Sequence, residues 1–96
     1  MAAKRQLEFS ARSLANMEVI KLHIAADNPA AATKGIKSVL STSEGLIDFP
    51  MLGHTGQRKG TRELVLSKYP YTIIYRLSLK KLHIVAVVHR SQLHPS

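Results

Sequence analysis

The stretch TRELVLSKYPYTIIYRLSLKKLHIVAVVH, residues 61–89, contains three runs rich in β-branched, aromatic and aliphatic residues. The runs cover residues 61–67, 71–77 and 82–89, and the short breaks between them predict an antiparallel meander. In the last run, residues 82, 84, 86 and 88 alternate with 83, 85, 87 and 89, and we expect the first set to face the helices. Pro70 cannot donate within a strand ladder, so we expect it to fix the turn before the middle strand.

Two helices are predicted ahead of these strands, after a short first strand in residues 4–9. Ser10 is suited to cap a helix over residues 11–26, and Asn28 with Pro29 is suited to begin a second helix that ends near residue 47. Residues 48–60 hold three glycines and a proline and are expected to form a surface loop. The expected inner faces are Leu14, Met17, Ile20 and Ile24 in the first helix, and Ala32, Ile36, Val39, Leu40, Ser43 and Ile47 in the second.

The order of elements therefore predicts an α+β fold, β-α-α-β-β-β, in which a helical hairpin packs on an antiparallel sheet. The 96 residues are expected to form one domain, 1–96. The chain has no cysteine, which excludes disulfides and fits a reducing, cytoplasmic environment. Its apolar runs are shorter than the roughly 18 residues of a membrane span, so we expect no membrane association.

No metal or cofactor is expected from the sequence. The histidines lack the paired spacing of metal ligands, and the glycines of residues 53–60 lead into a strand instead of a phosphate-binding helix. The five histidines are His23, His54, His83, His89 and His94.

The charge of the chain is concentrated in its second half. Residues 1–50 hold six Lys/Arg and five Asp/Glu, whereas residues 51–96 hold eight Lys/Arg and one Asp/Glu. A net charge of +7 on residues 51–96 favours association with a polyanion or with an acidic protein.

Four short motifs accompany this order of elements: P-x-x-G at residues 50–53, G-T-R-E-L at 60–64, P-Y-x-x-x-Y-R at 70–76 and V-x-H at 87–89. Together they resemble the RelE/ParE superfamily of toxins from bacterial type II toxin-antitoxin modules, over nearly the whole chain. The resemblance implies a small basic toxin that a cognate antitoxin neutralises. Members of this superfamily differ in their target, which is either DNA gyrase or the mRNA on the ribosome.

Residues that could serve a metal-independent RNA cleavage are present, but two features favour a ParE-like toxin. Ribosome-dependent nucleases of the RelE type often carry an arginine at the position of Thr72, and some carry a tyrosine near the C-terminus, where this chain ends QLHPS. His89 is the candidate general acid or base if the chain is a nuclease. Glu63 is expected to form an ion pair, on the opposite face of its strand from Arg62.

Three functions follow as hypotheses: a toxin that inhibits a DNA-processing enzyme such as gyrase, a RelE-like ribosome-dependent mRNA endoribonuclease, and a nontoxic adaptor on the same fold. The residues expected to contact the target are Arg58, Arg62, Arg76, His89 and Arg90, with the last four forming an electropositive rim. The residues expected to contact the antitoxin are Val19, Leu22 and Leu46, apolar positions outside the predicted inner faces.

Overall fold

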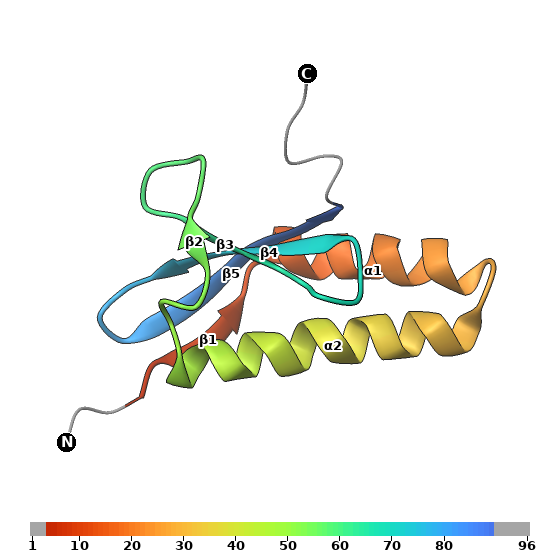
Figure 1. The fold of residues 1–96 in the computed structure, drawn as a ribbon, viewed down its shortest axis with the longest axis horizontal. Helices are drawn as coiled ribbons and strands as arrows, with labels where there is room; N and C mark the ends of the chain where they lie inside the picture. The colour runs from red at the N-terminus through yellow and green to blue at the C-terminus, as the bar shows by residue number, and fades with distance from the viewer. Residues whose placement is uncertain (1–3, 90–96) are drawn as a thin grey trace.

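The computed structural model describes residues 4–89 and confirms the predicted α+β arrangement, in which a helical hairpin covers one face of a sheet (Figure 1). The elements are β1 (Gln6–Phe9), α1 (Ala11–Ala25), α2 (Pro29–Asp48), β2 (His54–Thr55), β3 (Arg62–Val65), β4 (Tyr71–Leu77) and β5 (Lys81–His89). The short strand β2 lies in the segment that the sequence predicts to be entirely loop. It pairs with β3, so part of this segment belongs to the sheet.

Both helices begin at the predicted caps. The Ser10 hydroxyl accepts the backbone amide of Ser13 at 3.0 Å, and the Asn28 side chain accepts the amide of Ala31 at 3.1 Å. Pro29 occupies the first turn of α2, where its missing N–H removes no helical hydrogen bond. Only residues 26–28 separate the two helices, which therefore lie side by side as an antiparallel pair (Figure 1).

The sheet has the strand order β1-β5-β4-β3-β2 and is antiparallel except at one pair. β1 runs parallel to β5, which differs from the antiparallel sheet predicted from the sequence. The two strands are separated by the rest of the fold, so no tight turn forces them to be antiparallel.

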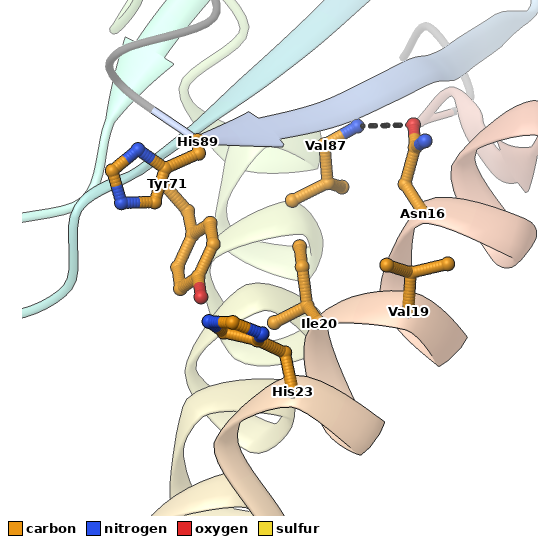
Figure 2. Close-up of a pocket in the computed structure, with 7 residues that line it drawn as sticks. All are labelled: Asn16, Val19, Ile20, His23, Tyr71, Val87 and His89. Atoms are coloured by element: carbon orange, nitrogen blue, oxygen red, sulfur yellow. Dashed lines mark hydrogen bonds between the residues drawn. The ribbon is translucent and has the colours of Figure 1, made fainter.

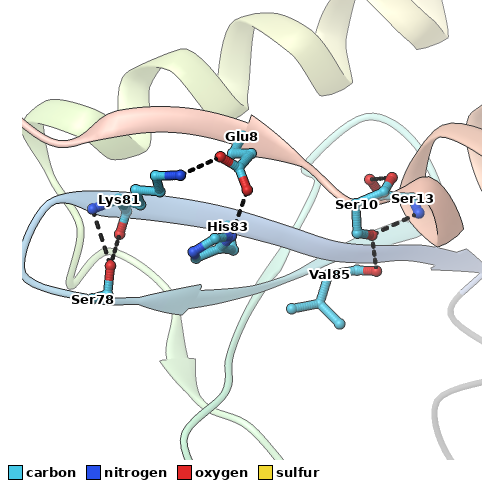
Figure 3. Close-up of polar contacts among 7 residues, drawn as sticks. All are labelled: Glu8, Ser10, Ser13, Ser78, Lys81, His83 and Val85. Carbon is cyan, nitrogen blue, oxygen red and sulfur yellow. Dashed lines mark hydrogen bonds and ion pairs between the residues drawn. The ribbon is translucent and has the colours of Figure 1, made fainter.

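Side chains reinforce this parallel pair (Figure 3). Glu8 of β1 lies 2.8 Å from Nζ of Lys81 and 3.4 Å from Nδ1 of His83, both in β5. The hydrogen bond and the charge of Lys81 lower the pKa of Glu8 below its ordinary value of 4.5.

A bulge in β5 changes which of its side chains face the helices. Ile74 pairs with Ala86 and Tyr75 pairs with Ile84, which leaves Val85 without an opposite residue. The Ser10 hydroxyl donates to the Val85 carbonyl at 2.7 Å, so the residue that caps α1 also holds the bulge (Figure 3).

The prediction that residues 82, 84, 86 and 88 share the helix face is therefore wrong beyond the bulge. The extra residue inverts the alternation, and Val87 joins the core below the helices. His89 pairs with Tyr71, a core residue, and so lies on the helix side of the sheet as well.

The core lies between the helical hairpin and the sheet, and it corrects three predicted helix positions. Leu46, predicted on the outer face of α2, is 0% exposed, whereas Leu40, predicted inside, is 37% exposed. Leu14 of α1 is 51% exposed, and the buried Ser13 takes the expected inner place. The buried apolar residues of the core are Met17, Ile20, Val39, Leu46, Leu66, Tyr71, Ile73, Tyr75, Leu82, Ile84 and Val87.

Candidate functional site

A loop between α2 and β2 is clamped to the sheet by two side chains from β3 and β4. The hydroxyl of Tyr75, which is fully buried, donates to the Pro50 carbonyl at 2.7 Å and accepts the backbone amide of Gly53 at 3.0 Å. Nη2 of Arg62 donates to the carbonyls of Met51, at 3.2 Å, and Gly53. An added Cβ at Gly53 would lie 2.7 Å from the Tyr75 hydroxyl, so the loop passes too close for any larger residue.

Three of the four sequence motifs meet in this clamp. The P-x-x-G motif at residues 50–53 supplies the loop, the motif at 60–64 supplies Arg62, and the motif at 70–76 supplies Tyr75. Gly60 has φ +83°, in the left-handed region, and makes the turn into β3. The motifs are therefore parts of one hydrogen-bonded unit that the linear sequence does not reveal.

A hollow of about 370 Å³ lies between α1 and the adjacent ends of β4 and β5 (Figure 2). The Asn16 side chain lines this hollow and accepts a hydrogen bond from the backbone amide of Val87 at 3.1 Å. The rings of Tyr71 and His89 meet edge to face, with centroids 5.6 Å apart, and His23 points toward the hydroxyl end of Tyr71. We call this hollow the groove; it is lined by Asn16, Val19, Ile20, His23, Tyr71, Val87 and His89.

The groove has an apolar wall with a polar rim, which suits an apolar side chain of a partner protein. Val19 is 66% exposed and Leu22 is 68% exposed, as the sequence predicts for an outward face of α1. Leu46 cannot contribute to an outer surface, because it is fully buried. No sequence pattern marks Asn16 or His23 as site residues, since their places in the groove depend on how α1 packs on the sheet.

Within residues 4–89, the predicted cationic residues do not form one rim. Arg76 is exposed and pairs with His83, on the sheet face away from the helices, whereas His89 lies on the helix face. His89 lies six positions after His83 in β5, which is roughly 20 Å at about 3.3 Å per residue. Arg62 is half-buried under the clamped loop, so the rim predicted from strand-end positions is wrong in its geometry.

Two predicted target contacts lie elsewhere. Arg58 is exposed in the turn after β2, where its carbonyl accepts both the amide and the hydroxyl of Thr61 at 3.1 and 2.6 Å. Arg90 lies outside the described residues. Contact of these residues with a target stays a prediction.

Of the groups that could support RNA cleavage, His89 lies on the helix face, whereas His54 pairs with Glu63 on the opposite face. Glu63 is 5% exposed and accepts the amide of Gln57 at 3.1 Å, and among residues 4–89 it has no ion pair of the kind predicted. Glu63 pairs with Ile74 and Arg62 with Tyr75, which confirms that these two neighbours point to opposite faces. Thr72 is fully buried.

Nearly the whole chain matches one protein family and one named relative. Residues 7–94 match the family described as ParE toxin of type II toxin-antitoxin system, parDE. A Sinorhizobium fredii (strain NBRC 101917 / NGR234) protein named "Putative toxin Y4kP" is 32% identical over 93 residues, which cover 97% of this chain and 96% of that protein.

A solved structure has the same fold. The chromosomal ParDE TA system from P. aeruginosa includes a chain that superposes with a TM-score of 0.81 at 19% identity. The similarity covers 90% of this chain and 96% of the other. Within residues 4–89, no helix is both long and apolar enough to cross a membrane.

Proposed function

The chain belongs to the ParE toxin family of type II toxin-antitoxin systems, and we propose that it inhibits DNA gyrase by binding and is neutralised by an antitoxin on the α1 side. The observation that carries the first part is the separation of His89, the candidate general acid or base, from Glu63 and Arg76. RNA cleavage requires a base, an acid and a cation around one phosphate.

His89, Glu63 and Arg76 do not meet around one point in the described chain. His89 faces the helices, whereas Glu63 pairs with Ile74 on the opposite face and is buried. Arg76 shares that opposite face but lies toward the other end of β4 from the partner of His89. Binding without chemistry fits this arrangement better than catalysis.

Thr72 supports the same proposal. It occupies the position where RelE-type nucleases often carry an arginine, and its side chain is fully buried. A buried neutral hydroxyl can neither reach a phosphate nor stabilise its charge as a guanidinium does.

The test combines a supercoiling assay with purified gyrase and mapping of RNA 5′ ends after expression without antitoxin. We expect inhibited supercoiling and unchanged 5′ ends. Cleavage of ribosome-bound mRNA that falls by about 10²-fold in His89→Ala would instead establish a nuclease. A chain that changes neither readout would be the nontoxic adaptor.

The antitoxin part of the proposal rests on the groove and on charge. Val19 and Ile20 provide an apolar wall, and Leu22 is exposed on the same helix. An amphipathic segment with apolar and acidic residues would cover this wall and complement the basic chain.

The product of the neighbouring gene is the probe for this part. We expect Val19→Asp to weaken its binding by at least about tenfold, because a carboxylate in an apolar contact is left unpaired. Leu79→Asp is the matched control, since Leu79 is 87% exposed in the turn between β4 and β5. Equal affinity of both variants would place the antitoxin elsewhere.

A further inference from the structure

The loop between α2 and β2 exposes three large apolar side chains within four residues. Phe49, Met51 and Leu52 are 67%, 66% and 63% exposed, and none belongs to the core. We call these three residues the apolar tip. Isolated exposed apolar residues are ordinary, but a group of them on one loop marks an interaction surface.

The apolar tip is held in a fixed shape. The amide of Leu52 donates to the Phe49 carbonyl at 3.0 Å. The Tyr75 and Arg62 side chains, which come from the sheet, form hydrogen bonds with the loop backbone. A loop that is already ordered loses less conformational entropy when it binds. The clamp therefore prepares the apolar tip for contact.

The charge around the apolar tip specifies the partner. Glu63 is the only carboxylate in residues 51–96, and it is buried. Asp48, next to Phe49, is paired with Lys4 at 2.6 Å. The exposed charged side chains that follow the apolar tip in the chain are consequently basic. Carboxylates on a partner would complement them.

The apolar tip and the groove are different surfaces. The loop of the tip is bound by Tyr75, whereas Tyr71 at the beginning of β4 lines the groove. A partner on the tip and an antitoxin in the groove would therefore make separate contacts.

We propose that the apolar tip is the anchor through which the chain holds the enzyme it inhibits, in an apolar cleft bordered by carboxylates. This inference rests on the proposed function, because it names the part of the toxin that engages the target. An apolar cleft that accepts one aromatic and two aliphatic side chains is a feature of a folded protein, which favours a protein over a nucleic acid as occupant.

The experiment compares wild type, the double variant Met51→Asp/Leu52→Asp and the control Leu79→Asp. Growth inhibition without antitoxin, inhibition of purified gyrase and thermal unfolding are measured for each. We expect half-inhibition by the double variant to need at least about tenfold more protein, because a few anchor residues carry most of the binding energy of an interface. The unfolding midpoint should be unchanged. If the double variant does not fold, Phe49→Ser tests the apolar tip with the same three measurements.

The outcomes separate this inference from the proposed target. If wild type inhibits gyrase and the folded tip variants inhibit it equally, the anchor is refuted and the gyrase proposal stands. If wild type stops growth without affecting gyrase and the tip variants do not stop growth, the anchor stands and gyrase is the wrong target. A wild-type chain that does neither refutes both.

Two other occupants of the apolar tip would also overturn the proposal. Loss of binding to the neighbouring gene product with intact gyrase inhibition would assign the tip to the antitoxin. A change from dimer to monomer in size-exclusion chromatography, with intact inhibition, would assign it to a second copy of the chain.

Discussion

Replacement of Tyr75 by phenylalanine tests whether the clamp stabilises the fold. The hydroxyl makes two hydrogen bonds, to the Pro50 carbonyl and from the Gly53 amide, at 2.7 and 3.0 Å. Tyr75 is 0% exposed and Gly53 is buried, so water cannot easily replace the lost hydroxyl at the Gly53 amide. Pro50 is only half-buried, so its carbonyl is better able to bind water.

The expected loss follows from these two bonds. One net hydrogen bond contributes about 1 kcal/mol, and an orphaned buried amide costs about 1–3 kcal/mol. We therefore expect Tyr75→Phe to lower the free energy of unfolding by about 2–4 kcal/mol. For a domain of this size that corresponds to roughly 10–30 °C in Tm.

Urea unfolding followed by far-UV circular dichroism measures this change. Tyr69→Phe is the matched control, because Tyr69 is half-buried and its hydroxyl has no hydrogen bond to the described residues. The control should stay within about 0.5 kcal/mol of wild type. A Tyr75→Phe protein as stable as the control would show that the clamp hydrogen bonds contribute nothing net to stability.

Two further predictions test the core and the parallel strand pair. Leu46→Ala should lower the free energy of unfolding by about 2–5 kcal/mol, and Leu40→Ala by less than about 1.5 kcal/mol, because only Leu46 is fully buried. Urea unfolding measures both values. A larger loss for Leu40→Ala would support the inner face predicted from the sequence. Glu8→Gln should be less stable than wild type at pH 7, since the lowered pKa of Glu8 means that the folded state favours its ionised form. That stabilisation is present above the ordinary pKa of 4.5 and disappears as pH falls through the lowered value, so the urea midpoints of the two proteins should converge as the pH is lowered past it. A difference that stays constant from neutral to acidic pH would contradict the ion pair.

The sequence predicts this fold well where the signal is local. Ser10 and Asn28 cap the helices as expected, because a cap depends on a side chain and on backbone amides two or three residues away. The strand at Tyr71–Leu77 has its predicted bounds, since alternation and a preceding proline are both visible in the chain. The exposure of Val19 and Leu22 follows from helix periodicity in the same way.

The candidate site is less predictable, because its contacts join distant segments. The Tyr75 hydroxyl bonds a loop 22 to 25 residues earlier in the chain, and no local pattern indicates that partner. The predicted rim assumed that residues near strand ends converge, but Arg76 and His89 occupy opposite faces of the sheet.

Local pattern is sufficient for the order of elements, the helix caps, the strand alternation and the excess of positive charge, because each depends on neighbouring residues or on composition. Tertiary packing is needed for the burial of Leu46 and for the direction of His89. α2 has apolar residues on more than one side, so contact with the sheet selects Leu46 for the core. The bulge at Val85 shifts the alternation by one residue and turns His89 into the groove, because the side-chain period of a strand is two and a single extra residue exchanges its faces.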